Sequence, residues 1–240
     1  MSDALPVLMQ EGEGPTLVLI HGFGGTKEQW GPVIRRLRHR AMVAVDLPGH
    51  GTALQWPNRH SPVAARDAVV ATLDHHGIER AHLVGHSRGG VIASLVALKA
   101  PERIERMTLL APGGYSTVLD RDGLAAMTEA ATLAEMRAAL APVYDPAPVP
   151  GLVPVRSPAQ RRALREILDT MGDDGPQATL NMGRIADTNI PLTMIWGSAD
   201  KVLPIDSLVD LPSTATLTRL DGAGHMLIEE RPEDIAHALA

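Results

Sequence analysis

The chain has 240 residues, of which 45% are hydrophobic and 21% charged, as in a globular protein with one large domain or one domain plus an insertion. A net charge of −6 argues against nucleic-acid binding, and the absence of cysteine excludes disulfides, thiolate metal sites and thiol chemistry. No leader pattern follows Met1 and no apolar run approaches the roughly 20 residues that span a bilayer, so we expect a cytoplasmic protein without a membrane partner.

Short apolar runs alternate with helical patterns over the first 110 residues. The runs expected to be strands are 16–20, 41–45, 81–84 and 106–110, and the helices expected between them are 30–37, 61–76 and 87–100. Ser61-Pro62 is typical of a helix start, with serine as the cap and proline in the first position. The alternation predicts an α/β fold with a mostly parallel central sheet of about seven strands and helices on both faces.

The alternation stops between Tyr115 and Asn189. Three helical stripes are expected there, and a proline-rich connector over 142–158 separates the second from the third. The third helix is expected to begin at Ser157 and to end within 172–176. The stripes consist of Leu124, Met127 and Ala131; Leu133, Met136 and Leu140; and Leu164, Ile167, Leu168 and Met171. We therefore expect an all-helical lid insertion over 115–189 and an α/β core made of 1–114 and 190–240.

The strand–helix pattern resumes after the insertion. Strands are expected over 191–196 and 215–220, and a closing helix is expected from about Pro232. Only about 15 residues precede the first expected strand, which limits the sheet to seven strands or fewer.

The stretch around Ser87 is typical of a nucleophile on a sharp turn. An apolar run ends at Gly85, Ser87 stands between Gly85 and Gly89, and a small and aliphatic run follows over 91–98. This is the G-x-S-x-G pattern, in which a buried strand meets a helix through a strained turn that presents the serine hydroxyl. The alternative is a serine that merely caps an ordinary helix.

Polar residues follow three other expected strands. They are His21, at the start of a glycine-rich stretch, Asp200 and His225. Since the carboxyl ends of parallel strands meet at one edge, Ser87, Asp200 and His225 can converge there as nucleophile, orienting carboxylate and base. The alternatives are a loop-capping Asp200 and a buried, hydrogen-bonded His225.

Two backbone N–H groups are candidates for an oxyanion hole. One belongs to Arg88, at the start of the helix after the nucleophile, and the other to Phe23, which follows His21-Gly22. We expect His21, His50 and His86 to be structural hydrogen bonders rather than catalytic groups.

A dinucleotide site and a metal site are both disfavoured. Gly22, Gly24 and Asp46 imitate part of a nucleotide-binding unit, but the third glycine of G-x-G-x-x-G would fall at Lys27. No HExxH or other close His and carboxylate spacing occurs, so no metal is expected.

Five stretches together resemble the α/β-hydrolase superfamily, in its branch of small lidded bacterial esterases, carbon–carbon bond hydrolases and perhydrolases. They are HGFGG at 21–25, DLPGHG at 46–51, GHSRGG at 85–90, WGSAD at 196–200 and GAGH at 222–225. The resemblance implies Ser87 as nucleophile, His225 as base, Asp200 as orienting acid, Phe23 and Arg88 as oxyanion donors, and no cofactor.

Arg88 departs from the apolar residue common after the nucleophile. The stretch resembles the GHDRG elbow of fluoroacetate dehalogenases, in which that arginine helps to hold a substrate carboxylate. With serine as the nucleophile, dehalogenase and epoxide hydrolase chemistry are not expected. A salt bridge to a nearby carboxylate is the alternative use of Arg88.

These observations predict a serine hydrolase that cleaves an ester-like bond of a small, largely apolar molecule through an acyl-enzyme. Because aromatic residues make up only 2% of the chain, an aliphatic pocket wall is expected, to which Met127, Met136, Met171 and Met182 would contribute unless they fill the core. One alternative is carbon–carbon bond hydrolysis of ring-cleavage products, since Ala111-Pro112-Gly113-Gly114 resembles a strand end of that group. Another is a hydrolase-fold ligand-binding receptor. The oligomeric state is not indicated.

Overall fold

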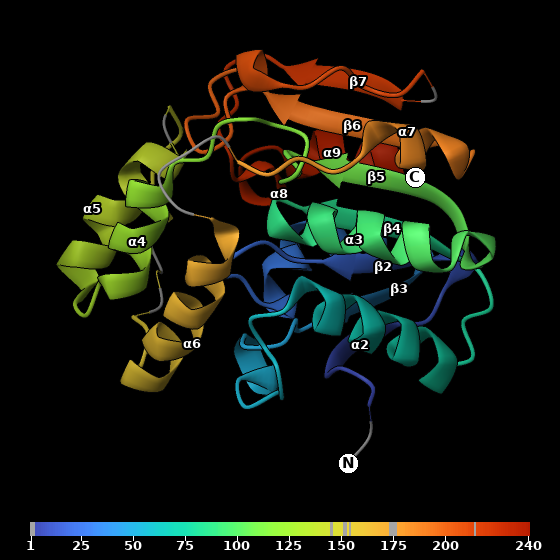
Figure 1. Cartoon of the computed structure of the whole chain (residues 1–240), viewed down its shortest axis with the longest axis horizontal. Helices are drawn as coiled ribbons and strands as arrows, with labels where there is room; N and C mark the ends of the chain where they lie inside the picture. Colours follow the sequence, from blue (N-terminus) through green and yellow to red (C-terminus); the bar gives the residue numbers. More distant parts are fainter. Residues whose placement is uncertain (1–2, 145, 151–152, 154, 173–176, 214) are drawn as a thin grey trace.

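The computed structural model describes residues 3–144, 146–150, 153, 155–172, 177–213 and 215–240. Within them lie one sheet and the helices around it (Figure 1). The strands are β1 (Val7–Gln10), β2 (Glu13–Ile20), β3 (Arg40–Val45), β4 (Ala81–His86), β5 (Ile104–Leu110), β6 (Leu192–Gly197) and β7 (Ala215–Leu220).

The seven strands form a mostly parallel sheet in the order β1-β3-β2-β4-β5-β6-β7. All neighbouring pairs are parallel except β1 with β3. The central strands are apolar because both of their faces are covered. Residues 17–20 of β2, for example, are completely buried. The predicted α/β class and sheet are confirmed.

Strand β1 was not anticipated. Its four residues are half-buried or exposed, and it joins the edge of the sheet antiparallel to β3, with Val7 opposite Val45 and Gln10 opposite Met42. A four-residue edge strand that faces solvent on one side lacks the length and the continuous apolar run by which the other strands were predicted.

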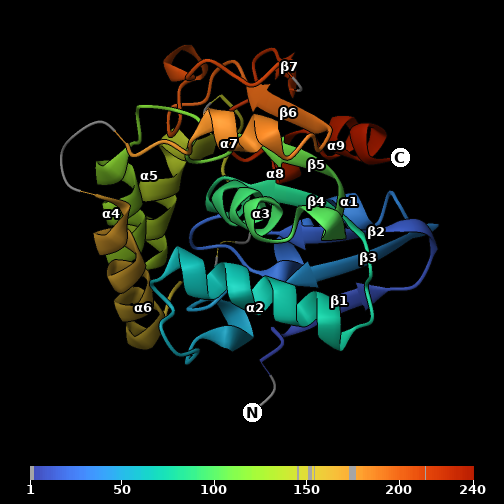
Figure 2. The same cartoon turned by 45° about the vertical axis from the view of Figure 1, so that its right-hand side comes forward.

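The helices cover both faces of the sheet, and most come from the predicted segments. In the described residues the α-helices are α1 (Gly31–Ile34), α2 (Pro62–His75), α3 (Arg88–Lys99), α4 (Arg121–Glu129), α5 (Leu133–Tyr144), α6 (Pro158–Leu168), α7 (Met182–Asp187), α8 (Leu227–Glu230) and α9 (Pro232–Leu239). Helices α2, α3 and α7 lie on one face, and α1, α8 and α9 lie on the other (Figures 1 and 2).

Two predicted helical boundaries are wrong. The helix expected over 30–37 is shorter, because the 3₁₀ turn η1 (Lys27–Trp30) leads into α1, which ends at Ile34. The connector expected from Pro142 begins later, since α5 continues through that proline to Tyr144. Burial of Val143 and Tyr144 favours the extra turn over the break that proline alone would cause.

Helices α4, α5 and α6 stand together at the end of the sheet where the parallel strands terminate, on the left of Figure 1. The first expected stripe is interrupted: α4 ends at Glu129, and the Glu135 carboxylate accepts hydrogen bonds from the N–H groups of Ala131 and Thr132 at the start of α5. The third helix begins at its capping box, in which Ser157 and Gln160 bond each other's backbone. Its expected end falls partly on 173–176, outside the described residues.

Between α6 and β6 the chain forms α7, which packs beside α3 rather than with α4–α6 (Figure 2). In the part of the chain that the structure covers, no helix has the length and apolar character needed to cross a membrane.

Candidate active site

Ser87 sits in a strained turn between β4 and α3. Its φ of 52° and ψ of −119° lie in a region that side-chain-bearing residues rarely adopt. Three backbone hydrogen bonds hold it: its N–H donates to Leu110 O at 2.9 Å, and its carbonyl accepts from Gly90 N–H at 2.9 Å and Gly113 N–H at 3.0 Å. The serine side chain makes no helix-capping hydrogen bond, so the alternative of an ordinary cap is wrong.

Glycines are required on both sides of the turn. A Cβ at Gly85 would lie 2.5 Å from Gly89 O, and one at Gly89 would lie 2.2 Å from Ile20 O. Backbone atoms cannot yield as a flexible side chain can. The close approach of α3 to β4 and β2 therefore depends on these two residues, as the sequence pattern indicated.

His225 and Asp200 come together at the same edge of the sheet. His225 Nδ1 lies 2.8 Å from Asp200 Oδ2, and both side chains are buried. The other oxygen of Asp200 accepts hydrogen bonds from the N–H groups of Val202 and Leu203, each at 2.9 Å. Asp200 therefore caps its loop and also contacts the imidazole, which leaves Nε2 of His225 for chemistry.

A carboxylate that was not predicted fixes the loop of His225. Glu230 accepts hydrogen bonds from Gly224 N–H at 2.7 Å and Met226 N–H at 2.8 Å, on the two sides of the histidine. Burial raises the pKa of Glu230. Its only sequence signal is its place at the end of the short apolar run after His225.

The loop after β2 carries Phe23, which lines the same cavity as Ser87. A Cβ at Gly22 would lie 3.0 Å from Ser87 Cβ, so this loop runs directly against the nucleophile. No group in the described ranges accepts a hydrogen bond from Phe23 N–H. The Arg88 N–H is the first of α3 and has no partner within that helix.

His21, His50 and His86 hold the surrounding backbone, as expected. Leu47 N–H donates to His21 Nε2 at 3.0 Å, and Gly24 N–H donates to His50 Nε2 at 3.1 Å. Because these Nε2 atoms accept, the ring proton of each lies on Nδ1. Burial lowers the pKa of His21 to about 4 and that of His86 to about 3, so these rings are neutral at neutral pH.

Asp46, the residue that imitated a nucleotide site, holds the same loop. It is completely buried and accepts hydrogen bonds from Lys27 N–H at 2.9 Å and Lys27 Nζ at 2.6 Å. Thr52 N–H donates to it as well, at 2.9 Å. Its carboxylate therefore has a structural role, because its hydrogen bonds go to Lys27 and Thr52 of the surrounding loops.

The Arg88 side chain serves neither of the two expected uses. It is buried, does not line the cavity at Ser87, and forms no ion pair with any described carboxylate. Both of its terminal nitrogens lack a hydrogen-bond partner among the described residues. Burial lowers the pKa of Arg88 to about 10, so the guanidinium remains charged at neutral pH.

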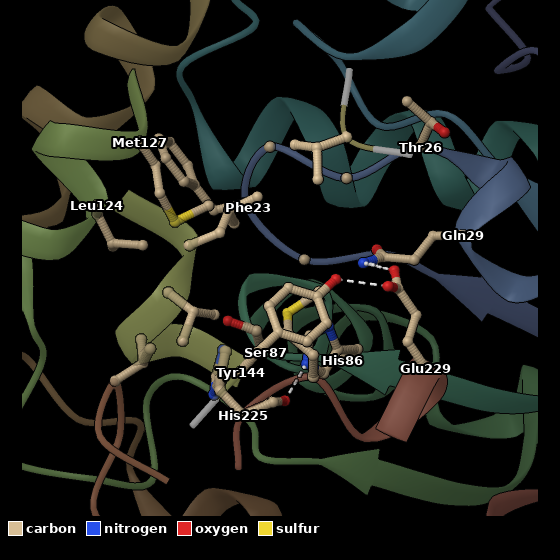
Figure 3. Close-up of a pocket in the computed structure, with 18 of the residues that line it drawn as sticks. Phe23, Thr26, Gln29, His86, Ser87, Leu124, Met127, Tyr144, His225 and Glu229 are labelled. Carbon is tan, nitrogen blue, oxygen red and sulfur yellow. Dashed lines mark hydrogen bonds between the residues drawn. The ribbon is translucent and has the colours of Figure 1, made fainter. Parts of the chain in front are cut away.

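A cavity of about 420 Å³ opens over Ser87 and His225. Figure 3 shows Leu124 and Met127 on one side of it and Gln29 and Glu229 on the other. The apolar wall comes largely from α4, α5 and the connector after them, namely Leu124, Met127, Met136, Leu140, Val143 and Val153. Of the four methionines considered from the sequence, Met127 and Met136 line the cavity, whereas Met171 and Met182 pack against the core.

The polar residues of the cavity that were not anticipated are Thr26, Glu28, Gln29, Tyr144, Arg156 and Glu229. Arg156 reaches from the connector to the carbonyls of Met127, at 2.5 Å, and Gly24, at 3.3 Å. Burial lowers the pKa of Arg156 to about 10. These residues belong to segments without a motif, and only the fold brings them to the site. Among the described residues, no cluster of His, Asp and Glu could hold a metal ion.

Known proteins resemble this chain over most of its length. A family model described as "Alpha/beta hydrolase family" matches residues 17–238. A relative from Pseudomonas putida, the dihydrolipoyllysine-residue acetyltransferase component of an acetoin cleaving system, is 31% identical over 93% of the chain, which spans only 62% of that protein. Monoacylglycerol lipase ABHD6 of Mus musculus is 26% identical, over 94% of the chain and 74% of the lipase.

A solved structure of similar fold is 2-hydroxy-6-oxo-6-phenylhexa-2,4-dienoate hydrolase from Rhodococcus sp. strain RHA1. The TM-score is 0.81 at 23% identity, covering 97% of this chain and 92% of that one.

Proposed function

The chain belongs to the alpha/beta hydrolase family, and from that premise we propose that it is a serine hydrolase acting on an ester-like bond of a small, largely apolar molecule. The observation that carries the proposal is the strained Ser87 facing the same cavity as His225, whose ring is hydrogen-bonded to Asp200. These are the three roles that nucleophilic acyl transfer needs, in the chain order of this family.

In the proposed reaction, Ser87 Oγ attacks the ester carbonyl carbon while His225 Nε2 takes the hydroxyl proton. The tetrahedral intermediate collapses, the carbon–oxygen bond to the alcohol breaks, and the protonated His225 returns the proton to the leaving alcohol. Water then attacks the acyl-enzyme and gives its proton to His225. Release of the acid restores the Ser87 hydroxyl, so the steps require only these side chains and water.

The proposed oxyanion hole consists of the Phe23 and Arg88 N–H groups. Neither has a hydrogen-bond acceptor among the described residues, and both belong to backbone next to Ser87. Losing one such donor typically costs about 3 to 4 kcal/mol of transition-state stabilisation.

We further propose that the insertion over 115–189 includes a lid made of α4, α5 and α6, whereas α7 packs beside α3, and that α4 and α5 supply the apolar wall of the cavity. A cavity of about 420 Å³ suits a small molecule rather than a polymer chain. A relative named as a lipase supports ester chemistry, whereas the 2-hydroxy-6-oxo-6-phenylhexa-2,4-dienoate hydrolase resembles this chain at the level of the fold.

The test is replacement of the nucleophile. Ser87→Ala should abolish turnover of p-nitrophenyl esters and covalent labelling by a fluorophosphonate, with the thermal unfolding midpoint of the wild type retained. Ester turnover that persists in Ser87→Ala would exclude the mechanism, and labelling without turnover in the wild type would favour a binding role. Assaying a ring-cleavage product beside the ester panel separates carbon–carbon from ester cleavage.

A further inference from the structure

Gln29, Tyr144 and Glu229 form a polar cluster in the cavity wall, called here the acceptor cluster. Gln29 Nε2 donates to Glu229 Oε1 at 3.2 Å, and the Tyr144 hydroxyl donates to Glu229 Oε2 at 2.5 Å (Figure 3). The three side chains come from η1, the end of α5 and α8, and all three line the cavity.

The acceptor cluster has unused capacity to accept hydrogen bonds. Among the described residues, each carboxylate oxygen of Glu229 accepts one hydrogen bond and has room for a second, and the Tyr144 oxygen keeps a lone pair after donating. Burial and the neighbouring Glu229 raise the pKa of Tyr144, so the phenol keeps its proton.

No cation compensates Glu229 in the described structure. No Lys, Arg or His nitrogen of the described residues lies within ion-pair distance of it, whereas the nearby Glu28 is paired with Lys27 at 3.2 Å. The cavity therefore offers hydrogen-bond acceptors to a bound ligand, and the ligand group that complements them is a hydrogen-bond donor.

The acceptor cluster lies on the histidine side of the cavity. Tyr144 follows Val143, whose carbonyl accepts from His225 N–H at 3.3 Å, and Glu229 is four residues after His225. Because the histidine protonates the leaving alcohol, that part of an ester lies on its side. The apolar wall with Leu124 and Met127, on the opposite side in Figure 3, is left for the acyl chain.

Resting on the proposed ester hydrolysis, we propose that the acceptor cluster is a subsite for free hydroxyl groups on the alcohol part of the substrate. The substrate class is thereby a monoester of a polyol with a short or medium apolar acyl chain. Glu229 and Tyr144 are specificity-determining residues in this assignment.

The hydrogen bond between Tyr144 and Glu229 also connects α5 to α8. If its role were only structural, the variants would give a different kinetic result. A tie would affect every ester alike, whereas a hydroxyl subsite changes the preference between two esters that differ only in their hydroxyls. The measured quantity is therefore the ratio of kcat/KM for glycerol monobutyrate to kcat/KM for propyl butyrate, by titration of released butyrate.

The wild type should prefer glycerol monobutyrate by at least about tenfold. Glu229→Gln and Tyr144→Phe should each lower that ratio about tenfold, mainly through glycerol monobutyrate. Glu28→Gln is the matched control, since it removes a carboxylate of the same cavity that is already paired, and it should keep the ratio within about twofold. A wild-type ratio near one, or equal losses on both esters, overturns the proposal.

A binding measurement separates this proposal from the catalytic one. In the Ser87→Ala background, calorimetry should give the same preference for glycerol monobutyrate, and adding Glu229→Gln should reduce it about tenfold. Equal affinities overturn the subsite even if esters are hydrolysed. A preserved preference without any turnover by the wild type rejects the proposed function and keeps the subsite.

Discussion

At the scale of single residues, close backbone approach at the turn of Ser87 positions both the proposed nucleophile and one proposed oxyanion donor. Gly89 stands where α3 meets β2, directly after Arg88, whose N–H is the proposed donor. A side chain at Gly89 would force α3 and β2 apart. We therefore expect both the packing of these two elements and the proposed catalysis to depend on the absence of a Cβ at this position.

Gly89→Ala should therefore lower the free energy of unfolding by about 2 to 3 kcal/mol, as overpacking does. It should also lower kcat/KM for p-nitrophenyl esters at least about a hundredfold, because the Arg88 N–H is displaced. The matched control is Gly31→Ala, where φ is −49° and the nearest atom is the flexible end of Arg35. It should leave unfolding unchanged or stabilise by about 0.5 to 1 kcal/mol. Urea unfolding and steady-state kinetics on both variants check the contrast, and equal behaviour would contradict it.

Residues at strand ends could be anticipated from the sequence, and so could Met127 and Met136 in the apolar wall, but the polar residues of the cavity wall could not. Ser87, Asp200 and His225 each follow an apolar run, and a parallel sheet brings such ends to one edge. Tyr144 and Arg156 lie in or beside a proline-rich segment without periodicity, so nothing local indicated their direction. The burial of Arg88 was missed because a charged residue is ordinarily expected at the surface.

At the scale of elements, the connector before α6 is tied to the rest of the site by Arg156. Its guanidinium contacts a carbonyl in α4, the sulfur of Met136 in α5 at 3.5 Å, and the carbonyl of Gly24 next to the proposed donor Phe23. One side chain thus links the lid helices to the loop of the oxyanion hole.

Arg156→Met should lower kcat/KM for p-nitrophenyl esters about tenfold, since hydrogen bonds from a charged donor contribute about 1.5 to 3 kcal/mol each. Amide hydrogen exchange in α4 and α5 should become faster, because these helices lose a shared contact. Arg162→Met, on the exposed side of α6, should change neither quantity. Unchanged exchange in Arg156→Met would show that the lid does not depend on this contact.

Helix existence was easier to predict than helix extent. The capping box at Ser157 marked the start of α6, because two side chains and two backbone groups satisfy each other there. The extension of α5 through Pro142 depends on the burial of Val143 and Tyr144 against other segments, which no local pattern encodes.

At the scale of the whole molecule, stability should depend on pH through buried imidazoles. His82 in β4 donates to or accepts from Thr108 at 2.8 Å, and burial lowers its pKa to about 3. With His21 and His86, it stays neutral in the folded state, whereas the unfolded chain binds the protons below about pH 6.5. Each such group therefore favours unfolding increasingly as the pH falls from about 6.5 toward its folded pKa.

The free energy of unfolding should fall with acidification by up to about 1.4 kcal/mol per pH unit for each of these histidines. His82→Gln removes one of them far from Ser87 and should flatten this slope by one proton. His60→Gln, at an exposed histidine, should leave it unchanged. Urea unfolding at several pH values between about 4 and 8 measures the slopes, and identical slopes in the two variants would contradict the assignment.

The mostly parallel sheet with helices on both faces was predictable because strands and helices alternate along the chain. The antiparallel β1 was not, since its pairing with β3 is set by the edge left open in the assembled sheet.

The proposed lid lies in the chain between Ser87 and the pair formed by Asp200 and His225. During synthesis the nucleophile is therefore made first, the covering helices next and the base last. By the proposed mechanism, a growing chain carries Ser87 without its proton acceptor, His225, until the helices of the cavity wall have been synthesised. On this proposal, the chain can become catalytically active only after the helices that restrict access to the cavity have been made.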